Sequence, residues 1–408
     1  MMFFPRETFP TDRVRLTTLF GRELLGRGHS IDLVMQAVDQ SVQVGRHDWF
    51  GRSVWVGPTD GGRGIVGRTR KTLLGILHDL KWLWRARADR YDSVLVSDKY
   101  LLGAIACVVA RMRGLKFFFW MTYPYHQAQV TLSEERLARS PRMALLRGKL
   151  TGYLLHRWII PRSDHVFVQS ERMAHDFAQA GTDPTRMTPV ITGIDLDGVE
   201  SGTRLRGKPA QGPLTIGYLG TLVRQRRLEI LVDMLDEIRR RGVAARLLLI
   251  GDGATPDDRL SIERRADELD LRDHIEITGF LPRREALKLI QTADVCVSPF
   301  RPSPALDVAS PTKLVEYLAL GLPVVANSHP DQTRVLRESR AGVVVPWAAR
   351  HFARAVLWLA RRSDDELAEM ARRGEDWVAQ NRSYARIADD FERACLSCVR
   401  VPKHVVNA

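Results

Sequence analysis

Hydrophobic positions along the chain alternate between short apolar runs and longer amphipathic stretches. In the first half, the apolar runs fall at residues 31–35, 53–56, 93–98, 115–120 and 165–169. Stretches with apolar residues at helical spacing lie between them, for example at 101–112 and 171–180. Short buried strands that alternate with helices are typical of a parallel sheet with helices on both faces. The first half therefore predicts a Rossmann-like α/β domain.

The same pattern starts again after a polar, glycine-rich stretch at 198–212 that has the composition of a linker. Further apolar runs fall at 246–250, 275–278, 295–298, 323–326 and 342–346, and the chain from 348 onward has a helical pattern. Since 408 residues exceed one ordinary domain, we expect two. The predicted boundaries are 1–197 for the first domain, 213–380 for the second and 381–408 for a closing helix.

Composition narrows the class of protein. The four cysteines give no disulfide framework, which favours a reducing compartment. Cys395 and Cys398 have C-x-x-C spacing, but no second pair is present to complete a zinc site. No apolar stretch is long enough for a membrane span, and charged residues near the start interrupt any leader sequence. We therefore expect a cytoplasmic protein.

The positive charge is concentrated in one region. Residues 51–162 hold 20 Lys and Arg against 7 Asp and Glu, which equals the whole net charge of +13. Two basic amphipathic stretches lie there, at 68–90 and 136–157, and they suit an anionic membrane surface, such as the inner face of a plasma membrane. The alternative is an ordinary helix in each case, with its apolar side in the core. Nucleic acid is not expected, because no nucleic-acid-binding motif accompanies the charge.

The segment at 295–327 carries the clearest chemical signal. A buried strand, a proline-rich loop, a helix and a second strand follow one another, and Ser310 and Pro311 are suited to begin the helix. The free N–H groups of Thr312 and Lys313, with the Lys313 ammonium, would then bind a diphosphate. Glu316 lies one turn further, where it could accept hydrogen bonds from ribose hydroxyls. The alternative is an ordinary α/β unit in which Lys313 and Glu316 form a solvated pair.

The residues SPTKLVEYLALGLPVVA resemble the donor-binding signature of the family 4 glycosyltransferases. The resemblance implies a GT-B fold, in which two Rossmann-like domains face each other across a cleft and the last helix returns to the first domain. It also implies that the N-terminal domain binds the acceptor and the C-terminal domain binds a nucleotide diphosphate sugar. Glu316 matches the second glutamate of the family's motif, whereas Val308 stands where the first is expected. Asp307 is one position away, and Ser310 and Leu314 belong to the same donor-binding segment.

Other donor contacts are expected at strand ends of the second domain. In the resembled family an arginine after a glycine, and a lysine five residues later, bind the donor phosphates; here Gly220 is followed by Thr221, and Arg226 stands at the second place. Arg226 keeps the charge, but Thr221 does not. Gly251 follows another strand. Gly279, Phe280 and Leu281 lie where the family places the base. A solvated helix start at Arg226 and a core position for Phe280 are the alternatives.

In the first domain, three residues could face the acceptor and one the donor sugar. Arg13 and Arg15 follow the first strand, where open parallel sheets bind ligands, although a salt bridge with Glu7 or Asp12 would explain them equally well. Tyr123 follows the strand at 115–120. In the resembled family a histidine near this place contacts the donor sugar, and His126 is the nearest match. A structural or exposed histidine is the alternative.

These expectations combine into one reaction. A sugar moves from a nucleotide diphosphate sugar to a saccharide or polyprenyl-linked acceptor, with Lys313, Arg226 and His126 as the candidate catalytic residues. Fixed cations replace a metal ion, so we expect no metal and no other cofactor. The resemblance implies retention of anomeric configuration and a role in polysaccharide synthesis. A sugar-nucleotide epimerase and an inactive nucleotide-binding scaffold remain as alternatives.

Overall fold

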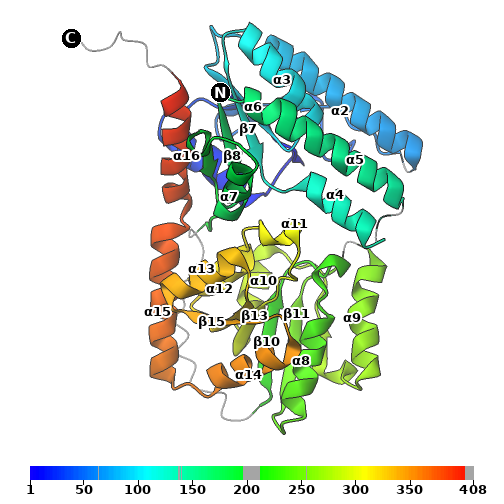
Figure 1. Ribbon diagram of the computed structural model, residues 1–408, viewed down its shortest axis with the longest axis vertical. Coiled ribbons are helices and arrows are strands. Elements are labelled where there is room, and N and C mark those ends of the chain that lie inside the picture. Colours follow the sequence, from blue (N-terminus) through cyan, green and yellow to red (C-terminus); the bar gives the residue numbers. More distant parts are fainter. Residues whose placement is uncertain (63, 137, 139, 196–211, 254, 400–408) are drawn as a thin grey trace, which may run out of the picture. The chain divides into compact units, whose positions relative to one another are not determined.

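The computed structural model describes every residue except 63, 137, 139, 196–211, 254 and 400–408. It consists of two compact units (Figure 1). Unit 1 comprises Met1–Thr192 together with Tyr384–Ala408, and unit 2 comprises Gly193–Ser383. The predicted linker falls almost entirely outside the described residues. The last helix of the described residues, α16 (Tyr384–Cys398), lies inside the range 381–408 predicted for a closing helix and belongs to unit 1.

Unit 1 is built on a parallel sheet with one antiparallel edge strand. Its strands run in the order β4-β5-β3-β1-β6-β7-β8-β9, β2 pairs with β3, and only β4 with β5 is antiparallel among the described pairs. The strands are β1 (Met2–Phe4), β2 (Thr8–Phe9), β3 (Asp32–Ala37), β4 (Gly45–Trp49), β5 (Arg52–Gly57), β6 (Ser93–Ser97), β7 (Lys116–Met121), β8 (His165–Val168) and β9 (Met187–Pro189). The helical segments are η1 (Arg15–Glu23), α1 (Leu24–Gly26), α2 (Ile65–Arg85), α3 (Tyr100–Met112), α4 (Tyr125–Glu134), α5 (Pro141–Leu154), η2 (Leu155–Ile159), α6 (Ile160–Arg162), α7 (Glu171–Gln179), η3 (Pro184–Arg186) and α16.

Aromatic packing joins the two ends of the chain within unit 1. Phe391 of α16 stacks on Phe167 of β8 with ring centroids 4.3 Å apart, and its ring also meets the edge of Phe20 of η1 at 5.4 Å. Trp120 of β7 lies in the same cluster. Burial of several large aromatic groups makes this cluster a major source of stability for unit 1.

Two features of unit 1 differ from the predictions, and a third bears on an alternative that the sequence left open. The polar strand β4 (GRHDW) was not predicted, because its sequence lacks alternating apolar positions. The segment after β7, for which no helix was predicted, forms the helix α4. For α2, which the sequence left open between a membrane-facing and a core-facing helix, Leu73, Leu77 and Trp84 do not pack into the core, since 55%, 64% and 58% of their surfaces are exposed.

Unit 2 is a six-stranded parallel sheet in the order β12-β11-β10-β13-β14-β15, counted over the described residues. The strand order reverses between β10 and β13, which is where open α/β sheets bind ligands. The strands are β10 (Leu214–Leu219), β11 (Ala245–Ile250), β12 (Ile275–Ile277), β13 (Val295–Ser298), β14 (Val324–Asn327) and β15 (Gly342–Val345). The helical segments are η4 (Arg224–Arg226), α8 (Glu229–Arg239), α9 (Pro256–Glu268), η5 (Arg272–His274), α10 (Arg283–Ile290), α11 (Pro304–Asp307), α12 (Thr312–Ala319), α13 (Pro330–Ser339), α14 (Ala349–Ala360) and α15 (Asp364–Asn381).

Candidate functional site

Three glycine turns lie together at the carboxyl edge of the unit 2 sheet. Gly220 follows β10, Gly251 follows β11 and Gly279 comes after β12, and all three have positive φ angles. A Cβ atom on Gly251 would lie 2.3 Å from the carbonyl oxygen of Gly220, and Gly251 forms a β-bridge with Gly279. Only glycine allows backbones to approach this closely in these conformations. The predicted donor-side glycines thus form one continuous backbone surface.

Lys313, the second residue of α12, lies directly beside this surface. Its side chain packs so closely on Gly220 that a Cβ atom there would come within 2.0 Å of Lys313 Cε. Lys313 is only 8% exposed, and no carboxylate among the described residues forms an ion pair with it. Burial, together with the nearby charge of Arg226, lowers the pKa of Lys313 well below its ordinary value. The charge of Glu316 acts in the opposite direction but does not offset the burial. A buried ammonium without a direct ion pair is costly, and an anionic ligand would relieve that cost.

Arg226 ends the short helix η4 and shares its aromatic neighbours with Lys313. Its Nη1 donates a hydrogen bond of 2.9 Å to the hydroxyl of Tyr218. The guanidinium carbon of Arg226 and the Nζ of Lys313 each lie 5.9 Å from the ring centroid of Phe300. The structure therefore brings the two predicted phosphate-binding cations to one place at the switch point of the sheet.

Glu316 has a partner that the sequence does not suggest. Its Oε1 accepts a hydrogen bond of 3.1 Å from Nη2 of Arg283, at the start of α10. The Glu316 side chain is 19% exposed and that of Arg283 is 45% exposed. The predicted alternative, a solvated pair with Lys313, is not what the structure contains, because Lys313 is buried.

The expected capping role of Ser310 is wrong. α12 begins at Thr312 after Pro311, with no side-chain cap. The hydroxyl of Ser310 instead accepts a hydrogen bond of 3.2 Å from Arg382, which is paired with Asp331 at 2.6 Å. Arg382 is 1% exposed, so the serine completes a buried polar network within unit 2. The first N–H groups of α12 still lack intrahelical partners, as at any helix start.

The remaining predicted donor residues take varied positions. Leu314 is buried in the core, so only its backbone could contact a ligand. Phe280 is 68% exposed rather than in the core, and Leu281 is half-buried. Thr221 is exposed. Asp307 ends the short helix α11, while Val308 is 3% exposed.

On unit 1, Arg15 is paired with Glu7 and stacks on an aromatic ring. The pair leaves 23% of the Arg15 side chain exposed, and its guanidinium lies 4.7 Å from the ring centroid of Trp120. Arg13 is exposed. Tyr123 packs edge-on against Tyr125 at 4.9 Å. The salt bridge that the sequence left open for Arg15 is therefore the one with Glu7.

His126 lies on α4, where its side chain is buried. It is 7% exposed and meets the ring of His156 at 5.5 Å. Burial, with a smaller effect of His156, lowers the pKa of His126 to about 4, so the imidazole is neutral at pH 7. Its Nδ1 has no hydrogen-bond partner among the described residues. Contact with a donor sugar stays a prediction for this residue.

Sequence reasoning missed a small cavity at the carboxyl edge of the unit 1 sheet. Its volume is about 50 Å³, and its lining includes Arg15, Trp120, Thr122 and Gln169. Trp120 Nε1 and Gln169 Oε1 are buried and have no hydrogen-bond partner within the described part of the chain. Nearby, burial raises the pKa of Asp98 to about 6, although hydrogen bonds from Thr122 act in the opposite direction. Their position directly after the predicted strands at 115–120 and 165–169, or at the end of these strands, could have identified them from the sequence.

No group of three or more His, Cys, Asp or Glu side chains among the described residues is arranged to hold a metal ion. Among the same residues, no helix has the length and apolar character needed to cross a bilayer.

Comparisons with known proteins match both halves of the chain. Residues 15–193 match the model for the glycosyl transferase 4-like domain, and residues 213–362 match that for the glycosyl transferases of group 1. The chain belongs to the family 4-like glycosyltransferases of GT-B type. Residues 15–193 lie almost entirely in unit 1, and residues 213–362 lie in unit 2.

The curated relatives match this chain over only part of their length. A putative colanic acid biosynthesis glycosyltransferase, WcaL of Escherichia coli, is 25% identical over 52% of each chain. A phosphatidyl-myo-inositol mannosyltransferase of Mycobacterium tuberculosis is 30% identical over 38% of this chain and 39% of its own. The chain thus spans about half the length, or less, of the curated relatives it matches.

Solved structures confirm the predicted GT-B fold. HepE from Anabaena, in complex with UDP and glucose, has a TM-score of 0.67 at 15% identity over 97% of this chain and 99% of its own. Sucrose-phosphate synthase from Thermosynechococcus elongatus has a TM-score of 0.71 at 16% identity over 97% and 98% of the two chains. At these identities the likeness concerns the fold.

Proposed function

We propose that the protein transfers a sugar from a nucleotide diphosphate sugar to a saccharide or lipid-linked saccharide, with retention of anomeric configuration. The single observation that carries this proposal is Lys313, a buried ammonium without a carboxylate partner among the described residues, at the start of α12. The relatives named above are a putative glycosyltransferase of colanic acid biosynthesis and a phosphatidyl-myo-inositol mannosyltransferase, which supports the same reaction class.

In the proposed reaction, the bond between the anomeric carbon and the diphosphate oxygen breaks, and its electron pair stays on the diphosphate. Lys313, Arg226 and the first N–H groups of α12 stabilise the developing charge. The acceptor hydroxyl forms the new bond to the anomeric carbon and gives its proton to the departing diphosphate. Since fixed cations neutralise the leaving group, the reaction is expected to need no metal.

Glu316 is the proposed ribose partner. Its carboxylate accepts one hydrogen bond from Arg283 in the structure. The two hydroxyls of a ribose could donate to the same carboxylate in its place. The base would lie beside Gly279 and Phe280, whose exposed ring can stack on it. Thr221, Gly251, Leu281, Asp307, Ser310 and Leu314 complete the proposed donor side, with Ser310 acting through the Arg382 network.

A catalytically inactive nucleotide-binding protein is the second candidate. It is favoured by Val308, a buried apolar residue where the family motif has a carboxylate, because only Asp307 is left nearby to contact the sugar. An epimerase would need more carboxylates over the sugar and is less supported.

One experiment separates these candidates. The full chain is incubated with a panel of UDP-, GDP- and ADP-sugars, and the products are followed by NMR of the anomeric proton, with and without EDTA. Transfer or slow hydrolysis with retention, unaffected by EDTA, supports the proposal. Binding without any turnover supports the inactive candidate, while a new epimer of the intact sugar nucleotide supports an epimerase.

We further propose that unit 1 binds the acceptor and lies on an anionic membrane surface. Arg13, Arg15 and Tyr123 are the proposed acceptor residues, together with the unpaired polar atoms of Trp120 and Gln169. Helices α2, α3 and α5 pack side by side (Figure 1). They expose large apolar side chains among their many arginines and lysines, including Leu73, Leu77, Trp84, Leu101, Met112, Leu146, Leu150 and Tyr153. Exposed apolar groups amid positive charge are typical of interfacial helices.

Liposome co-sedimentation tests the membrane proposal. Vesicles with anionic lipid should bind the full chain, and the double variant Leu73→Ser, Leu77→Ser should bind several-fold less. Leu260→Ser, which changes an exposed leucine of α9 in unit 2, is the matched control and should bind like the unmodified protein. Equal binding to neutral and anionic vesicles would contradict the proposal.

A further inference from the structure

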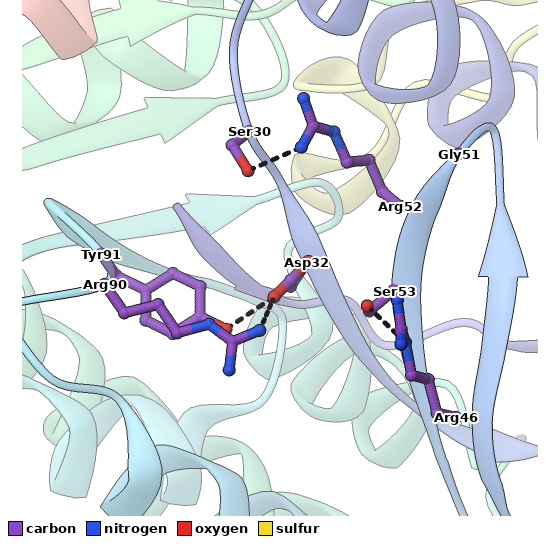
Figure 2. A pocket seen from close by; sticks show the side chains of 8 residues that line it. All are labelled: Ser30, Asp32, Arg46, Gly51, Arg52, Ser53, Arg90 and Tyr91. Atoms are coloured by element: carbon purple, nitrogen blue, oxygen red, sulfur yellow. Dashed lines mark hydrogen bonds and ion pairs between the residues drawn. The ribbon is translucent and has the colours of Figure 1, made fainter.

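Unit 1 contains a second, larger cavity at the edge of the sheet opposite its carboxyl ends. Its volume is about 240 Å³, and it is formed by the amino ends of three strands and the β4–β5 turn. Asp32 begins β3, Arg52 begins β5, and Tyr91 precedes β6. Figure 2 shows that the side chains around it come from separate parts of the chain.

Three arginines line this cavity against a single carboxylate. Asp32 is 8% exposed and already has two donors, the hydroxyl of Tyr91 at 2.6 Å and Nη2 of Arg90 at 3.3 Å. Burial and the bond to Asp32 raise the pKa of Tyr91, so the phenol stays a donor. The carboxylate of Asp32 is the negative charge in the lining of the cavity, and it is paired with Arg90.

Arg46 and Arg52 are held in place by neutral groups. Nε of Arg46 donates to the hydroxyl of Ser53 at 2.9 Å, and Nη1 of Arg52 donates to that of Ser30 at 3.2 Å, as the dashed lines in Figure 2 show. Neither guanidinium forms an ion pair with a carboxylate of the described residues. The nearby Asp48 accepts a bond from the Gly51 backbone and does not line the cavity.

This arrangement has two positive charges without compensation and free N–H groups on both. Planar guanidinium groups bind phosphate oxygens through paired hydrogen bonds, and two of them match a group with two negative charges. The serine hydroxyls orient the arginines without neutralising them. The cavity is large enough for a phosphate with a small attached group.

We propose that Arg46 and Arg52, beside the Asp32-paired Arg90, form a phosphate-binding site on unit 1, separate from the diphosphate site around Lys313. The ligand is a phosphate monoester or diphosphate, either free in solution or carried by a lipid headgroup. At the opposite strand ends from the acceptor residues, this site would hold a phosphorylated molecule without taking part in the transfer.

The test uses the full chain with Lys313→Ala, so that the donor site does not contribute. Pyrophosphate is titrated by calorimetry at low and moderate salt, and vesicles with and without phosphatidic acid are tested by co-sedimentation. Arg46→Gln and Arg52→Gln, each added to this background, should weaken binding of the phosphate probe by about tenfold or more. Arg52→Lys, which keeps the charge but not the paired hydrogen bonds of a guanidinium, should weaken binding of the phosphate probe less than Arg52→Gln does.

Arg87→Gln is the matched control, because it removes one exposed arginine near the cavity without altering its lining. If Arg46→Gln and Arg52→Gln weaken pyrophosphate binding and Arg87→Gln does not, the ligand is a soluble phosphate compound. If they weaken only the binding to vesicles with phosphatidic acid, the ligand is a lipid headgroup. Both results support the site. If Arg87→Gln weakens binding as much as Arg52→Gln, or if neither probe binds, the proposal is overturned. Denaturation midpoints of all variants show whether each one is folded.

Discussion

Replacing Lys313 by methionine should have opposite effects on stability and on nucleotide binding. Methionine has a similar length and no charge, so the variant Lys313→Met removes the buried ammonium, which has no direct ion pair, while it keeps the packing on Gly220. Replacing buried charges by apolar groups of similar volume is typically neutral or stabilising by about 1–4 kcal/mol. We therefore expect a higher free energy of unfolding in the absence of ligand.

The same variant should bind UDP or another nucleoside diphosphate more weakly. One charge-assisted contact contributes about 1.5–3 kcal/mol, which corresponds to a loss of about 10- to 150-fold in Kd. Urea denaturation measures the first effect and calorimetry the second, with Lys288→Met, an exposed lysine on α10, as the control. Lower stability together with unchanged affinity would refute the reasoning.

The lowered pKa of Lys313 adds a dependence on pH. A diphosphate beside the amine raises its pKa, so in the window between the free and the bound values each binding event takes up a proton. Affinity should therefore fall as pH rises through this window. Calorimetry in buffers of different ionisation enthalpy should detect the proton uptake for the unmodified chain and not for Lys313→Met.

Three further predictions concern single residues. Glu316→Gln should weaken nucleotide binding by about tenfold, measured by calorimetry, whereas Arg283→Gln, which removes only the present partner, should leave affinity within about threefold; equal losses would contradict a ribose contact. Gly220→Ala should abolish the nucleotide-induced thermal shift, because its Cβ displaces Lys313 and its φ of 146° strains alanine, while Gly212→Ala, with open space around it, should keep the shift. Acidification from pH 7 to 5 should lower the free energy of unfolding by about 2 kcal/mol for each of His126 and His165, since a pKa near 4 in the folded state favours protonation of the unfolded chain. In urea denaturation, His126→Gln should remove its share of this loss, and the exposed His175→Gln should not.

The sequence predicted strands and helices better than it predicted the hydrogen-bond partners of side chains. Periodicity located most strands and helices, because a buried strand or an amphipathic helix depends on the pattern of neighbouring residues. The hydroxyl of Ser310, in contrast, is held by Arg382, 72 positions away. Glu316 is held by Arg283, 33 positions away. A pattern of neighbouring residues carries no information about hydrogen-bond partners that lie so far away along the chain.

Helical spacing of apolar residues also does not show whether these residues are buried in the core or exposed on the surface. The positions of Leu73, Leu77 and Trp84 predicted α2 well, yet these side chains are exposed, while Leu83 is buried. The helix α4 was missed for the opposite reason. Its sequence, YHQAQVTLSE, has few apolar positions, and it begins directly after Pro124. Its formation depends on tertiary contacts, among them the close packing of His126 on Gly148 and Gly152 of α5.

The two units use positive charge in different ways, and salt should distinguish them. Lys313 is buried, so mobile ions screen its interaction with a diphosphate weakly. The arginines and lysines of α2 and α5 are mostly exposed, and at about 0.15 M salt screening acts over about 8 Å. Raising salt from 0.05 to 0.5 M should therefore release the protein from anionic vesicles, while nucleotide affinity falls much less. If both fell in parallel, the ammonium of Lys313 would have to be solvated, and the argument for a preorganised diphosphate site would fail.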